Sequence, residues 1–273
     1  MLSAAEDKMD LQAWITLSNQ SGVDYHHAQL RFVAGDVHGG QQNPLPAPII
    51  RAAMLQMAVA PMAQEDLFEY HLYRLAGATT LLNQQTRQVA LLSAAAVPVR
   101  KSLELHGANN YYQTSYGALG EPLKVAVFVA FENKGAGLGV PLPKGVMRFY
   151  QKDSAGNLQF IGADNIDHTA RDDTVRLQLG DAFDVYAQKK QTDFRKTGTD
   201  RNGYTYESAY QITLHNAQSA AVTVQVFEPI PGDWQIVDES LAHRKVSSGA
   251  ALWQVLVPAQ GAAVLTYRVR VQL

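Results

Sequence analysis

Cysteine is absent from the chain of 273 residues. Disulfide scaffolds, thiol nucleophiles and thiolate metal sites all need that residue, so its absence excludes all three. An excess of basic charge is also lacking, because the net charge is −2 at pH 7. Without a basic field there is no electrostatic reason to bind nucleic acid or an anionic membrane, and we expect no nucleic-acid partner.

Long hydrophobic runs are missing as well. The most apolar segment, 49–63, reads IIRAAMLQMAVAPMA and is interrupted by Arg51 and Pro61. It falls short of the ~20 apolar residues that a membrane-spanning helix needs. The opening stretch MLSAAEDKMDLQ has neither the basic start nor the apolar centre of a signal peptide. The sequence therefore predicts no transmembrane segment, and no signal peptide in the chain as given.

Common catalytic motifs do not occur either. The sequence has no HExxH zinc motif and no Gly-x-Ser-x-Gly nucleophile elbow. The stretch ENKGAGLGVPLP, with Gly135, Gly137 and Gly139, suggests a dinucleotide-binding loop, but such a loop must lead into a helix. Pro141 and Pro143 forbid a helix there, and GVMRFYQ alternates like a strand. We interpret this segment as a corner between strands.

What the sequence does contain is alternation of apolar and polar residues, the pattern of β-strands. The clearest signal is Asn202-Gly203 between two long alternating runs. Asn-Gly favours a type I′ turn, because both central residues need positive φ, so we predict an antiparallel pair of 183–197 with 203–216. Further strands follow roughly every 10 residues, a rhythm typical of a sandwich. The sequence predicts an all-β protein.

We predict a two-lobed β-sandwich. The first lobe, 1–181, is β-rich and carries a flexible insertion at 38–66, where Gly, Gln and Pro give way to Ala and Met. A Met-rich helix that contacts a partner is the alternative reading of that insertion. The second lobe, 182–273, is expected to be immunoglobulin-like. The runs ALWQVLVPAQ and AVLTYRVRVQL predict a hairpin that closes it.

Four stretches of the chain resemble one known family. They are GVDYHHAQLRFVAGDV, FEYHLYRLAGATTLLNQQTRQVALL, the long run FENKGAGLGVPLPKGVMRFYQKDSAGNLQFIGADNIDHTARDDTVRLQLGDAFDV, and YQITLHNAQSAAVTVQVFEPIPGDWQIV. Together they resemble the bacterial domain-of-unknown-function family 4139, which also forms the C-terminal part of mucoidy inhibitor A-like proteins. The resemblance extends from about residue 11 to the end of the chain.

The resemblance implies an exported, β-rich protein, periplasmic or in the cell envelope. It supplies no catalytic residues, because the family has no agreed enzymatic activity. Members normally carry a signal peptide and more β-sequence before the strands that open this chain. Either the chain is a fragment or its start was assigned too late, and in both cases we expect the first lobe to lack a strand or two.

Acidic residues gather in IGADNIDHTARDD, residues 161–173. Asp164, Asp167, His168 and Asp172 offer the oxygen and imidazole ligands that bind divalent cations, and they are the candidate metal ligands. The alternative is that these residues occupy turns between strands, where Asp and Asn bond to nearby backbone.

Tyrosines follow both sides of the Asn202-Gly203 turn. Tyr186, Tyr204 and Tyr206 are candidate ligand-binding residues, because their rings could line a face on which sugars stack. The alternative is that they are ordinary strand residues, since aromatic side chains are favoured in cross-strand pairs.

These observations favour a non-enzymatic structural or interaction module of the cell envelope. Two alternatives stay open: a divalent-metal-dependent hydrolase centred on the Asp164–Asp173 loop, and a carbohydrate-binding β-sandwich. We expect a protein or a cell-envelope glycan as the partner. We expect no cofactor other than a structural divalent cation.

Overall fold

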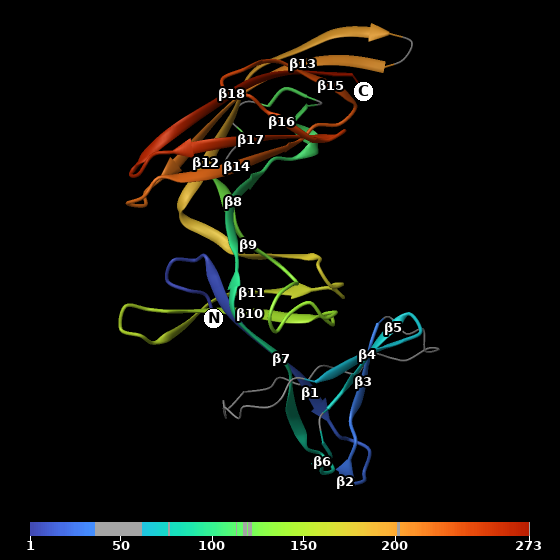
Figure 1. Cartoon of the computed structure of the whole chain (residues 1–273). Coiled ribbons are helices and arrows are strands. Elements are labelled where there is room, and N and C mark those ends of the chain that lie inside the picture. Colours follow the sequence, from blue (N-terminus) through green and yellow to red (C-terminus); the bar gives the residue numbers. More distant parts are fainter. Residues whose placement is uncertain are drawn as a thin grey trace. The chain divides into compact units, whose positions relative to one another are not determined.

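The computed structural model describes residues 1–35, 62–75, 77–112, 114–116, 119, 122–200 and 203–272. Within these ranges the regular structure consists of β-strands and one short 3-10 turn, so the protein is all-β, as predicted (Figure 1). No helix in the described ranges is long and apolar enough to cross a membrane. The chain divides into two compact units, and each is described by itself.

The first unit comprises residues 1–100 and 130–177. Its strands are β1 (Lys8–Ser18), β2 (Tyr25–Ala28), β3 (Arg31–Ala34), β4 (Ala63–Leu67), β5 (Tyr70–Arg74), β6 (Thr79–Leu81), β7 (Thr86–Pro98), β10 (Gly145–Lys152) and β11 (Leu158–Ile166). They form small antiparallel sheets, which pair β1 with β7, β10 with β11, β2 with β6, and β3 and β4 with β5. Apolar residues of β7, among them Val89, Leu91 and Leu92, are buried in this unit.

The second unit comprises residues 101–129 and 178–273. Its elements are β8 (Arg100–His106), the 3-10 turn η1 (Asn109–Tyr112), β13 (Gly203–Asn216), β14 (Val222–Pro229), β15 (Asp233–Glu239), β16 (Arg244–Ser247), β17 (Ala250–Val257) and β18 (Gly261–Gln272). Two long strands, β9 (Leu123–Glu132) and β12 (Thr174–Asp200), contribute residues to both units.

One nine-stranded sheet organises the second unit, in the order β15-β18-β13-β12-β9-β8-β14-β17-β16. Strand β17 also contacts β13 and β18, which lie at the other end of this order, so the sheet folds back on itself as a β-sandwich. Alternate residues point into the space between the two layers. The largest buried side chains there include Trp253, Tyr210, Ile212 and Leu265.

The long hairpin predicted around Asn202-Gly203 is confirmed. Strands β12 and β13 pair antiparallel from Val185 with Asn216 to Asp200 with Gly203, and they run side by side in Figure 1. Residues 201–202 of the turn lie outside the described residues. Strand β13 continues the pairing on its other edge with β18, without a register shift.

The hairpin predicted to close the second lobe is wrong. Although β17 and β18 are consecutive in the chain, β17 pairs with β14 and β16, whereas β18 pairs with β13 and β15. The short connection between them crosses from one layer of the sandwich to the other. Alternation identified both strands correctly, but it carries no information about which neighbour each strand takes.

The two compact units also differ from the lobes expected at 1–181 and 182–273. Residues 101–129 belong with the C-terminal residues, because β8 pairs in parallel with β14 and so enters the nine-stranded sheet. The predicted insertion at 38–66 falls mostly on residues outside the described ranges. Its last residues form part of β4, which pairs with β5.

Candidate functional site

The β12–β13 hairpin presents two chemically different faces. Along β13 the even-numbered residues Tyr210, Ile212 and Leu214 are buried in the sandwich core. Because side chains alternate along a strand, Tyr204 and Tyr206 share this inner face, and Glu207 lies on the outer face. A shift in register between Gln191 and Asp193 of β12 decides which side chains of β12 join each face.

An aromatic strip occupies the inner face near the end of the hairpin. We define this aromatic strip as Phe194, Lys196, Tyr204 and Tyr206. The rings of Phe194 and Tyr206 stack at 5.7 Å, and those of Tyr204 and Tyr206 lie 6.2 Å apart. The Lys196 ammonium sits 3.6 Å from the centroid of the Tyr204 ring, within the range of a cation–π contact.

The aromatic strip begins where burial of the inner face ends. Tyr210 is 1% exposed, whereas Tyr204, six residues nearer the turn, is 47% exposed. Phe194 and Tyr206 have intermediate exposure, and Lys196 is exposed. The strip therefore offers solvent a half-exposed ring with an ammonium over one of its faces, so a ligand could stack on the ring and accept hydrogen bonds from the lysine.

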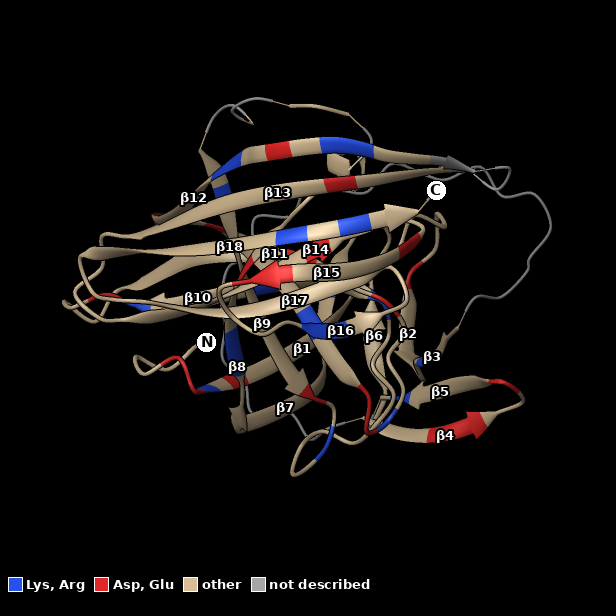
Figure 2. Cartoon of the chain, turned by 90° about the horizontal axis from the view of Figure 1, so that it is seen from above, with Lys and Arg blue, Asp and Glu red and all other residues tan. Residues whose placement is uncertain are grey.

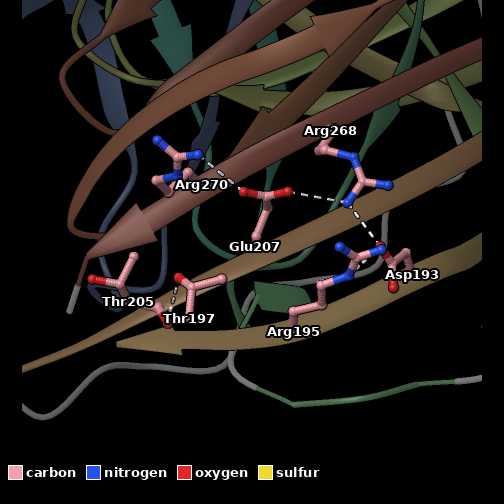
Figure 3. A network of polar contacts seen from close by, with 7 residues as sticks. All are labelled: Asp193, Arg195, Thr197, Thr205, Glu207, Arg268 and Arg270. Carbon is pink, nitrogen blue, oxygen red and sulfur yellow. Dashed lines mark hydrogen bonds and ion pairs between the residues drawn. The ribbon is translucent and has the colours of Figure 1, made fainter. Parts of the chain in front are cut away.

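The outer face of the same strands carries a charged network, which we define as Asp193, Arg195, Glu207, Arg268 and Arg270 (Figure 3). The Arg268 guanidinium donates to the Asp193 carboxylate at 2.8 Å and to the Glu207 carboxylate at 3.2 Å. Arg270 donates to Glu207 at 3.1 Å, and the Arg195 Nε lies 3.0 Å from Asp193. Figure 2 shows basic and acidic residues on the neighbouring strands β12, β13 and β18.

The charged network shifts the ionisation of its members. The hydrogen bond from Arg268, followed by that from Arg195, holds the pKa of Asp193 below its ordinary value. The same bond to Asp193 raises the pKa of Arg268. Two carboxylates are shared among three guanidinium groups, so every charged group of the network has an opposite charge as its partner. The network as a whole carries one excess positive charge.

A second ion pair lies inside the sandwich. Lys189 of β12 and Glu228 of β14 are 0% and 1% exposed, and Lys189 Nζ is 2.7 Å from Glu228 Oε2. The Tyr112 hydroxyl donates to the same carboxylate oxygen at 2.9 Å and lies 3.1 Å from the Tyr267 hydroxyl. Gly107 leaves room for the carboxylate, because a Cβ at that position would come within 2.2 Å of Glu228 Oε2.

Tyrosine rings surround the Lys189 ammonium. It lies 4.4 Å from the ring centroid of Tyr111, 4.7 Å from that of Tyr210, 5.6 Å from that of Tyr267 and 5.9 Å from that of Tyr112. Burial lowers the pKa of Lys189, and the attraction of Glu228 opposes that effect. Burial raises the pKa of Tyr210 to about 12 and that of Tyr112 and Tyr267 well above the ordinary value, so these hydroxyls stay protonated at neutral pH.

Sequence reasoning missed the Lys189–Glu228 pair. A signal was present on one side, since Lys189 alternates with the apolar residues Val185 and Ala187 of β12, and a charge at an inward position needs a partner. The partner could not be found in the same way, because β12 and β14 are separated in the sheet by β9 and β8.

The candidate metal ligands lie at the end of β11 and in the loop after it. Asp164 accepts a hydrogen bond from the backbone of Asn165, the backbone carbonyl of Asp167 accepts one from Thr169, and His168 Nδ1 accepts one from the Lys144 backbone. Asp172 adopts a positive φ of 66°, and its side chain pairs with Arg171 at 3.5 Å. Within the described parts of the chain, no three His, Asp or Glu side chains converge where they could hold a metal ion. Asp167, His168 and Asp172 therefore lie in the loop after β11, as the alternative expects, whereas Asp164 is part of the strand β11 itself.

The three candidate tyrosines do not form one surface. Tyr204 and Tyr206 belong to the aromatic strip on the inner face. Tyr186 pairs with His215, an odd-numbered residue of β13, and therefore lies on the outer face. Its ring stacks on that of His215 at 4.7 Å.

The glycine-rich stretch at 133–143 is the predicted corner. The strand β10 follows it, and the buried Asn133 side chain ties the loop together. The Asn133 amide donates to the carbonyls of Val140 and Ala170, and its oxygen accepts from the Gly139 backbone. Both the NH2 group and the oxygen of the Asn133 side chain are therefore hydrogen-bonded to the backbone of this loop.

A shallow hollow is lined by Leu241, Ala242, His243, Arg244, Leu252 and Gln254. His243 Nδ1 lies 3.0 Å from the Glu239 carboxylate, which also accepts from the His243 backbone and from the Trp253 indole at 2.9 Å. Glu239 therefore caps the turn that leads to β16. The contact between His243 and Glu239 therefore has a structural role in this turn.

The comparisons with known proteins leave the aromatic strip and the charged network to be argued from geometry alone. No family model, no curated protein and no solved structure matches this chain.

Proposed function

We propose that this chain is a non-enzymatic interaction module of the bacterial cell envelope, and that it binds envelope carbohydrate through the aromatic strip. The observation that carries the proposal is the half-exposed ring of Tyr204 with the Lys196 ammonium 3.6 Å from its centroid. The resemblance to family 4139 supports the cell-envelope location and a periplasmic setting.

The chemistry of the aromatic strip suits a sugar. The faces of pyranose rings carry C–H groups that pack on aromatic rings, while their hydroxyls need hydrogen-bond partners. Tyr204 and Tyr206 supply adjacent rings, and Lys196 supplies an ammonium with three donors. The antiparallel pairing of β12 with β13 brings these groups together before binding, which reduces the entropy lost by the protein.

The proposal extends to the fold of the second lobe, which we assign to the immunoglobulin-like sandwiches. Its support is the two-layered packing of strands around the buried Trp253. The proposal gives no role to a cofactor. In it, Asp164 acts as a strand residue and Asp167, His168 and Asp172 act as loop residues, so the hydrolase alternative has no observation among the described residues in its favour.

A glycan array of bacterial envelope polysaccharides tests the proposal, followed by titration of any hit. Replacing Tyr204 with Ala should weaken binding about tenfold or more, which corresponds to the loss of about 1.4 kcal/mol of stacking. Tyr186→Ala is the matched control, because it removes an exposed tyrosine from the opposite face of the same hairpin. Equal losses in both variants, or no binding by the unaltered chain, would contradict the proposal.

A further inference from the structure

The Lys189–Glu228 pair holds an amine and a carboxyl group in contact inside a water-excluding core. Lys189 Nζ and Glu228 Oε2 are 2.7 Å apart, and both side chains are almost fully buried. Reacting groups fixed at such separations behave as if they were at very high concentration, because the entropy of bringing them together is already spent.

The two oxygens of Glu228 are in different situations. Oε2 accepts hydrogen bonds from Lys189 Nζ and from the Tyr112 hydroxyl. Oε1 is buried and has no hydrogen-bond partner among the described residues. A carboxylate with one bonded and one unbonded oxygen is costly in a dry core, because each unpaired charged oxygen loses its hydration without replacement.

Burial also favours the reactive form of the lysine. Desolvation lowers the pKa of Lys189, which favours the neutral amine that can act as a nucleophile. The carbon that this amine would attack belongs to the carboxyl group whose oxygen lies 2.7 Å away.

We propose that Lys189 and Glu228 condense to an intramolecular amide that covalently joins β12 to β14. Nζ attacks Cδ of Glu228, and Oε2, held by the Tyr112 hydroxyl, carries the developing negative charge and becomes the amide oxygen. The bond from Cδ to Oε1 then breaks. Oε1 leaves as water with two of the three protons of the Lys189 ammonium, so atoms and charge balance without any co-reactant.

Amide formation would remove the two features that make the buried Lys189–Glu228 pair energetically unfavourable. The product carries no charge, and the unpartnered oxygen is gone, while the amide oxygen keeps its bond from Tyr112. The amide bridges strands that two other strands separate in the sheet order. In a chain without cysteine, such a bond would cross-link the sandwich as a disulfide does elsewhere.

Intact mass spectrometry of the denatured full chain tests this inference. The mass should fall below that of the sequence by one water. Proteolysis and fragmentation should yield a branched peptide in which residue 189 is joined to residue 228. A chain of unmodified mass would overturn the inference, and so would a lost water that maps to any other residues.

Three variants sharpen the assignment. Lys189→Met and Glu228→Leu should each have the full mass of their own sequence, because each removes one reactant. Lys190→Met removes the adjacent exposed lysine and should retain the loss of one water. Because the amide forms only in the folded core, a retained loss of water in Lys190→Met shows that replacing a lysine of β12 does not by itself prevent the reaction. Retention of the loss in Lys189→Met would overturn the assignment.

Discussion

The second unit contains two ionic clusters built from the same long strand, and their surroundings differ completely. Lys189 meets Glu228 among tyrosine rings at almost zero exposure, whereas Asp193, four residues later, meets Arg268 on the outer face at 27% exposure. A charge pair in the interior depends on near-perfect geometry, since removal of either partner leaves the other charge unpaired in a medium of low dielectric. On the surface, water and salt replace a lost partner, so the same chemistry contributes little.

A β-bulge makes both clusters from one strand. Before the register shift at Gln191/Asp193, the odd-numbered residues of β12 face the core, and Lys189 is one of them. After the shift the even-numbered Phe194 faces inward, which turns Asp193 to the outer face. Without the extra residue, simple alternation would direct Asp193 into the apolar interior. The bulge therefore separates the buried pair from the exposed network.

Breaking the buried pair should have the largest effect on stability. Lys189→Met prevents the proposed amide and leaves the Glu228 carboxyl group buried without its partner, and we expect the free energy of unfolding to fall by about 3–5 kcal/mol. Urea denaturation followed by tryptophan fluorescence measures the change. Lys190→Met, at the neighbouring exposed position, should stay within about 0.5 kcal/mol.

The double variant Lys189→Met with Glu228→Leu adds a second check on this prediction. It also removes the Glu228 carboxyl group that Lys189→Met leaves unpaired, so it should be more stable than Lys189→Met alone. A double variant less stable than the single one would show that the cost does not arise from the unpaired charge.

Apolar contacts in the same core should come next in size. Val224→Ala removes buried methyl groups and should cost about 1–3 kcal/mol, since Val224 is fully buried. Val264→Ala makes the same chemical change at a residue that is 50% exposed and should cost about 0.5 kcal/mol or less. Comparable losses in the two variants would contradict the placement of Val224 between the layers.

Local signals in the sequence predicted strands and tight turns well. Asn202-Gly203 predicted the antiparallel pairing of β12 with β13, although Asp200 pairs with Gly203, so that Gly203 belongs to the strand β13. This signal acts over a few residues, because turn geometry depends on the conformations open to the residues that form the turn. It predicts that a hairpin forms there but not its exact register.

Long-range pairing could not be predicted in the same way. Alternation assigns a face to each residue but not a neighbour to each strand, so the partners of β17 and β18 were assigned wrongly. The parallel pairing of β8 with β14 was not predicted for the same reason. Of the candidate site, Tyr204 and Tyr206 were identified from composition, but the bulge that places Phe194 and Lys196 beside them leaves no sequence signature.

Breaking the charged network should affect stability less than either core variant. Arg268→Met keeps much of the aliphatic chain and removes the guanidinium that bridges Asp193 and Glu207. We expect a loss of about 1 kcal/mol or less, because these partners can be rehydrated. The loss should shrink in 1 M salt, where charges are screened over roughly 3 Å. A larger loss that salt does not change would place this network with the buried pair.

The smallest expected effect is a dependence on pH that belongs to Asp193 alone. Its pKa is held below the ordinary value in the folded chain, chiefly by the hydrogen bond from Arg268, so its contribution to stability is present above the unfolded pKa of about 3.9 and is lost as pH falls through the folded pKa. The stability difference between the unaltered chain and Asp193→Asn should therefore be constant from pH 5 upward, as roughly expected from that reference value, and should shrink in acid. Urea denaturation of both proteins across this range measures the difference. In the Arg268→Met background the hydrogen bond is gone, so Asp193→Asn should produce a much weaker dependence on pH. A difference that grows as pH falls would mean that Asp193 is not stabilised as an anion by its arginine partners.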